Sequence, residues 1–75
     1  MKTIKIYTIS WCSHCRELKN FLKECNLKYE DFDVENDEKS AEYIIEKTGQ
    51  DGFPIIDING EIIIGFDKEK IKKYI

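Results

Sequence analysis

The stretch Trp11-Cys12-Ser13-His14-Cys15 decides how this chain is interpreted. An apolar run rich in β-branched residues precedes it, Ile4-Lys5-Ile6-Tyr7-Thr8-Ile9. A segment with helical spacing follows it, with apolar residues at Leu18, Phe21, Leu22 and Cys25. The first pattern predicts a strand and the second an amphipathic helix, so the two cysteines are expected at a strand-to-helix junction.

That position favours redox chemistry of the thiols. Free N–H groups and the helix dipole stabilise negative charge at a helix N-terminus, so we expect Cys12 to be a thiolate and the nucleophile. Cys15 follows one helical turn later, close enough to form a disulfide with Cys12, and is the expected resolving thiol. The alternative is half of a zinc site, but zinc needs four ligands and only His14 and Cys25 remain. The spacing therefore predicts thiol–disulfide exchange.

Length and charge narrow the class of protein further. With 75 residues, the chain is expected to form a single domain over 1–75. The formal net charge of -3, with both signs mixed along the chain, argues against nucleic-acid binding. Neither a membrane-spanning apolar stretch nor a secretory leader is visible, so we expect no membrane contact and a cytoplasmic protein. In that compartment disulfides are transient and catalytic. We also expect the protein to be a monomer.

The periodicity predicts an α/β protein with the order βαβαββα. Strands are expected over 2–9, 28–34, 53–58 and 61–64. Helices are expected over 13–25, from Asn36 or Asp37 to Gly49, and from an Asp67 N-cap onward. A crossover helix makes the first two strands parallel, and the last two form a hairpin, which gives a four-stranded mixed sheet flanked by three helices.

Local signals fix the ends and the inner faces of these elements. Asn26 is a candidate left-handed residue after the first helix, and Asn59-Gly60 predicts a two-residue type I′ turn. Phe66 before the Asp67 cap fits a hydrophobic staple with Ile71. Cys25, in register with Cys15, Leu18 and Leu22, is expected to be a buried small hydrophobe. The inward faces of the later helices are predicted as Ala41, Ile44, Ile45 and Thr48, then Ile71, Tyr74 and Ile75.

Element order, size and three motifs together resemble the glutaredoxins, which have the smallest form of the thioredoxin fold. The motifs are Cys12-Ser13-His14-Cys15, Phe53-Pro54 and Gly65-Phe66-Asp67. The resemblance is closest to short glutaredoxin-like redoxins. It implies a dithiol oxidoreductase that reduces protein or small-molecule disulfides, with no bound cofactor and with glutathione as a candidate co-substrate. It also implies a cis bond before Pro54 and a substrate- or glutathione-binding surface formed by Trp11, Phe53, Pro54, Gly65, Phe66 and Asp67.

Several positions depart from the glutaredoxin pattern. Ile9 stands where many glutaredoxins have a lysine that contacts glutathione, and Trp11 before the nucleophile is reminiscent of thioredoxin. The electron donor is therefore open between glutathione and a thioredoxin-type reductase. His14 precedes the second cysteine, as in protein disulfide isomerase, and is predicted to stabilise the Cys12 thiolate and raise the reduction potential. A metal or iron–sulfur carrier using Cys12, as some glutaredoxin-like proteins are, is the alternative function.

Overall fold

Strands and helices follow one another along the chain in the predicted order. The computed structural model describes residues 3–10, 12–49 and 52–75. Its elements are β1 (Ile4–Thr8), α1 (Ser13–Glu24), β2 (Glu30–Asp33), α2 (Glu38–Thr48), β3 (Ile55–Ile58), β4 (Glu61–Ile64) and α3 (Lys68–Lys72). The order βαβαββα is thereby confirmed, while β1, β2 and β3 are shorter than the apolar runs that predicted them. Gln50 and Asp51, where the sequence Gln50-Asp51-Gly52 predicts a turn, lie outside the described residues.

The four strands form one mixed sheet in the order β2-β1-β3-β4. β1 runs parallel to β2, because α1 carries the chain back between them, and antiparallel to β3. β3 and β4 form the predicted hairpin, in which Ile58 pairs with Glu61. Asn59 and Gly60 both have positive φ, 51° and 96°, as a two-residue type I′ turn requires.

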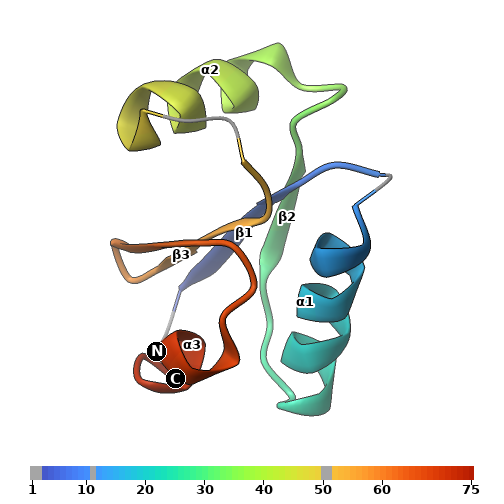
Figure 1. Ribbon diagram of the computed structural model, residues 1–75, viewed down its shortest axis with the longest axis vertical. Coiled ribbons are helices and arrows are strands. Elements are labelled where there is room, and N and C mark those ends of the chain that lie inside the picture. Colours follow the sequence, from blue (N-terminus) through green and yellow to red (C-terminus); the bar gives the residue numbers. More distant parts are fainter. Residues whose placement is uncertain (1–2, 11, 50–51) are drawn as a thin grey trace.

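The sheet has a separate apolar core on each face. α1 and α3 cover one face and α2 covers the other (Figure 1). Alternation along the strands divides their side chains between the two, so that Ile56 faces α1 and α3 whereas Ile55 faces α2. The first core contains Ile4, Ile6, Leu18, Phe21, Leu22, Ile56, Ile58, Ile63 and Ile71. The second contains Tyr7, Val34, Ile44 and Ile55.

The helix ends follow the predicted capping chemistry. Asp37, rather than Asn36, is the N-cap of α2, and Asp67 is the N-cap of α3. Gly49 ends α2 in the left-handed conformation with φ 71°, and Asn26 after α1 has φ 57°. Phe66 packs against the core that contains Ile71, as the staple requires.

Three side chains predicted to face inward are exposed instead. Cys25 is the C-cap of α1, where the chain leaves the helix, so its side chain no longer follows the stripe of Cys15 and Leu22. Ile45 is 40% exposed, because α2 buries Ile44 and turns its neighbour away from the sheet. Tyr74 is 41% exposed, because α3 has already ended at Lys72.

Candidate active site

The two cysteines of the motif lie at the N-terminus of α1. Cys12 is the N-cap residue, with extended backbone angles (φ -99°, ψ 115°), and the helix begins at Ser13. This conformation turns the Cys12 sulfur back over the first turn, where it accepts a hydrogen bond from the Cys15 N–H at 3.3 Å. The sulfur therefore does what an N-cap oxygen does in other helices, since it satisfies one of the free amides.

The two thiols differ in access and in ionisation. Cys12 is half-buried, whereas Cys15 is 1% exposed. Burial, together with a hydrogen bond to Cys12, raises the pKa of Cys15 to about 12, and a backbone hydrogen bond from Ile9 and the charge of Lys19 lower it only in part. Cys15 is therefore a protonated thiol at neutral pH, and Cys12 is the sulfur that a substrate can reach.

The Phe53-Pro54 motif lies against the cysteines, although it is distant in sequence. The Phe53–Pro54 peptide bond is cis, as the resemblance implied. The Cys12 thiol donates to the Phe53 carbonyl oxygen at 3.8 Å, and the Gly65 N–H donates to the Pro54 carbonyl oxygen at 2.8 Å. Cys12, Cys15, Phe53, Pro54 and Gly65 thus form one connected region.

Phe66 and Asp67 have structural partners of their own. The Phe66 ring packs edge-on against Phe21 of α1, with the ring centroids 6.0 Å apart. Lys68 Nζ lies 5.8 Å from the centroid of each of these rings. Asp67 Oδ1 accepts a hydrogen bond from the Lys70 N–H at 3.3 Å. Their role as substrate contacts stays a prediction, and Trp11 lies outside the described residues.

His14 lies on the exposed side of the first turn of α1. Its side chain is 68% exposed, and its Nδ1 is 3.7 Å from Glu17 Oε2, an ion pair only while the imidazole is protonated. The contact that the structure gives the His14 imidazole is thus with Glu17. The proposed effect of His14 on the Cys12 thiolate stays a prediction.

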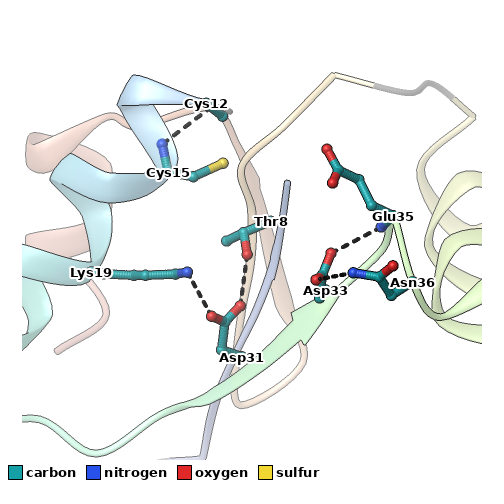
Figure 2. A network of polar contacts seen from close by, with 8 residues as sticks. All are labelled: Thr8, Cys12, Cys15, Lys19, Asp31, Asp33, Glu35 and Asn36. Carbon is teal, nitrogen blue, oxygen red and sulfur yellow. Dashed lines mark hydrogen bonds and ion pairs between the residues drawn. The ribbon is translucent and has the colours of Figure 1, made fainter. Parts of the chain in front are cut away.

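Sequence reasoning missed three polar side chains near Cys15, namely Thr8, Lys19 and Asp31 (Figure 2). Lys19 had a signal, because it follows Cys15 by four residues and so lies on the same helix face. Thr8 and Asp31 had none, because the pairing of β1 with β2 brings them together.

Two findings concern metal binding and membrane insertion. Within residues 3–10, 12–49 and 52–75, no three histidine, cysteine, aspartate or glutamate side chains are grouped so that they could hold a metal ion. None of the helices in that part of the chain is long and apolar enough to cross a membrane.

Comparison with known proteins identifies the family to which the sequence is similar. The family model described as Glutaredoxin matches residues 4–63. A curated glutaredoxin-like 8.6 kDa protein of the rubredoxin operon of Clostridium pasteurianum, described as uncharacterized, is 40% identical over 72 residues. That match covers 96% of this chain and 96% of the relative.

Solved structures of the same fold align over nearly the whole chain. The T8A mutant of the thioredoxin-like protein BC3987 is 34% identical, with a TM-score of 0.91 over 99% of this chain and 95% of that one. The glutaredoxin-like NrdH-redoxin of Escherichia coli, whose activity profile is described as thioredoxin-like, is 22% identical, with a TM-score of 0.86 over 95% of this chain and 92% of that one. The thioredoxin-like glutaredoxin fold is thereby confirmed.

Proposed function

This chain belongs to the glutaredoxin family, and we propose that it reduces protein or small-molecule disulfides by dithiol exchange through Cys12 and Cys15. The observation that carries the proposal is the contrast between the two sulfurs. An accessible sulfur caps a helix, and a buried, protonated thiol lies one turn away on the same helix. Dithiol exchange needs such a pair, with one thiol to attack the substrate and one to resolve the product.

The reaction has two displacement steps. In the first, the Cys12 thiolate attacks one sulfur of the substrate disulfide, and the other sulfur leaves as a thiolate. In the second, Cys15 gives up its proton and attacks Cys12 Sγ, which forms the Cys12–Cys15 disulfide and releases the second substrate sulfur. Two electrons pass from the dithiol to the substrate, and the two product thiolates take up protons.

The geometry suits this order of events. Once Cys12 is in a mixed disulfide it carries no charge, so its negative charge no longer opposes ionisation of Cys15. The Phe53 backbone beside Cys12 supports an extended substrate that pairs with it like an added strand. All of these groups come from one chain, so a monomer is sufficient for the reaction.

The proposal also concerns the electron donor that reduces the Cys12–Cys15 disulfide again. Ile9 is half-buried against the α2-side core, where many glutaredoxins have a lysine for glutathione. The Phe66 ring is packed on Phe21. Neither residue offers a polar group to glutathione, so we expect weak glutathione coupling and a thioredoxin-type reductase as the better donor. A reducing compartment such as the cytoplasm fits this chemistry. The described residues offer nothing that favours a metal or cluster carrier.

Single-cysteine variants test the proposal. Cys12→Ser should abolish reduction of a protein disulfide such as those of insulin, measured with dithiothreitol as reductant. Cys15→Ser should accumulate mixed disulfides with the substrate, detected by mass spectrometry. Cys25→Ser is the matched control and should keep full activity, because Cys25 is exposed at the far end of α1. An active Cys12→Ser protein would contradict the proposal.

A further inference from the structure

Three polar side chains from three different elements meet near Cys15 (Figure 2). Thr8 of β1 donates its hydroxyl hydrogen to Asp31 Oδ1 at 2.7 Å. Lys19 Nζ of α1 lies 2.7 Å from Asp31 Oδ2 of β2. Each of the two carboxylate oxygens of Asp31 thus has its own partner. We call these residues the Thr8–Asp31–Lys19 cluster.

The cluster is held more firmly than a surface ion pair. Thr8 is 2% exposed, and the side chains of Lys19 and Asp31 are each 33% exposed. Thr8 fixes the carboxylate from the core side, so the lysine meets an acceptor whose position is already set. Exposed pairs are weak because two long, free side chains must be ordered together, and here one of the two is ordered by the sheet.

Helix spacing places Lys19 one turn from the thiol. Cys15 and Lys19 are four residues apart, so they lie one above the other on the same face of α1. Asp31 holds the end of the Lys19 side chain beneath the buried sulfur (Figure 2).

Lys19 and Cys15 each affect the pKa of the other. The charge of Lys19 lowers the pKa of Cys15, against the larger effects of burial and of Cys12. The pKa of Lys19 is raised, chiefly by its hydrogen bond with Asp31, with smaller contributions from Tyr29 and Cys15. Lys19 therefore keeps its positive charge at neutral pH.

We propose that Lys19 supports the resolving step, in which its ammonium, positioned by Asp31 and Thr8, stabilises the Cys15 thiolate as that thiolate forms. The inference rests on the proposed dithiol function. Cys15 loses its proton to solvent and attacks Cys12 Sγ. The Cys15–Cys12 bond forms, the bond from Cys12 to the substrate breaks, and the leaving sulfur takes the electron pair and then a proton. Lys19 keeps its own proton throughout.

The aromatic disulfide dithiobis(nitrobenzoate) separates the two steps in one experiment. Added in equal amount to the reduced Cys25→Ser protein, it should release nitrothiobenzoate in two phases, the first from attack by Cys12 and the second from displacement by Cys15. Lys19→Met should slow the second phase about three- to tenfold at pH 7 and move its pH dependence to higher pH. The first phase should be unchanged, which a general structural defect would not produce.

Further variants make the assignment specific. Lys19→Arg should restore most of the second-phase rate, because it keeps the charge near Asp31. Lys23→Met, an exposed lysine one turn later on α1, is the matched control and should change neither phase. Asp31→Asn should slow the second phase less than Lys19→Met does, because the ammonium stays but loses its anchor.

The outcomes separate this inference from the function on which it depends. A parent protein without a second phase would contradict dithiol exchange itself. A normal second phase in Lys19→Met, or equal slowing of both phases, would overturn the role of Lys19. A faster second phase in Asp31→Asn would overturn the anchoring role of Asp31, because the carboxylate would then be opposing the thiolate.

Discussion

Cys12 and Cys15 are three positions apart, yet they differ in the properties that control a thiol. Cys12 caps the helix and contacts the Phe53 carbonyl oxygen. Cys15 is enclosed between α1 and the sheet, where burial holds its proton in place. A substrate disulfide can therefore meet Cys12 first and Cys15 only through Cys12.

Replacement of His14 should make the dithiol more reducing. A protonated imidazole near the Cys12 thiolate favours the reduced form, so its removal lowers the potential. We expect a shift of about 30 mV, equivalent to about 1.4 kcal/mol, in both His14→Ala and His14→Pro. Equilibration with glutathione redox buffers measures it. The side chain is 68% exposed and pairs with Glu17, so unchanged potentials in both variants would make His14 an ordinary surface residue.

The exposure of Cys25 leads to a labelling prediction. In the Cys12→Ser protein, iodoacetamide should modify Cys25 quickly in the native state and leave Cys15 unmodified. Exposure presents the Cys25 sulfur to the reagent, whereas burial, the largest cause of the raised pKa of Cys15, remains in this variant and keeps Cys15 unreactive. Peptide mass spectrometry locates the label. Addition of urea should make Cys15 reactive as well, and equal native labelling of the two thiols would contradict the structure.

At the scale of elements, the N-cap of α2 ties stability to pH. Asp37 accepts hydrogen bonds from the Ser40 N–H at 3.3 Å and the Ser40 hydroxyl at 2.8 Å. The hydrogen bonds from the Ser40 side chain and backbone lower the pKa of Asp37 below its ordinary 3.8. A carboxyl whose pKa is lower in the folded protein stabilises it above the ordinary pKa, and this contribution is lost as the pH falls through the folded value.

Asp37→Asn should therefore be less stable than the unsubstituted chain near neutral pH, and the gap should narrow as the pH falls below the ordinary carboxyl value of 3.8. Asparagine still caps a helix but carries no charge to titrate. Urea unfolding at a series of pH values measures the difference. Glu46→Gln, an exposed carboxylate on the same helix, is the control and should show a smaller dependence. A gap for Asp37→Asn that is constant across pH would contradict the linkage.

At the scale of the whole molecule, α1 lies on one face of the sheet and carries both cysteines. β1 leads into the motif, β2 contributes Asp31 beside β1, and the turn before β3 brings Phe53 to Cys12. α2 covers the opposite face, with Ile44 in a separate core (Figure 1). The reactive end of the molecule is therefore built by residues far apart in the sequence.

The side chains around this site should determine which electron donor reduces the protein faster. We expect slow reduction by glutathione with its reductase and faster reduction by a thioredoxin-type reductase, at equal amounts of the same disulfide substrate. Ile9→Lys should improve the glutathione reaction because it adds a cation beside the site. Consumption of NADPH measures both rates. Fast glutathione turnover that Ile9→Lys does not improve, with no response to thioredoxin reductase, would contradict this expectation.

Local signals in the sequence are enough to predict the elements, their order and the reactive pair. Periodicity predicts the strands and helices, Asn59-Gly60 predicts the hairpin, and Cys12 with Cys15 predicts the chemistry, because each of these signals is local. Faces at helix ends were less well predicted. Cys25 lies at the end of α1, and Tyr74 lies beyond the end of α3. Ile45 lies beside Ile44, the residue that α2 buries. Spacing alone predicts all three side chains to be buried, whereas all three are exposed.

The surroundings of the reactive pair, in contrast, depend on how the elements pack together. The contact of Phe53 with Cys12 depends on how β3 enters the sheet, and the meeting of Thr8 with Asp31 depends on the parallel pairing of β1 and β2. Burial of Cys15, which raises its pKa, follows from packing of α1 on the sheet. The physical reason is that desolvation and charge act through space, so residues that are distant along the chain set the chemistry of a local motif.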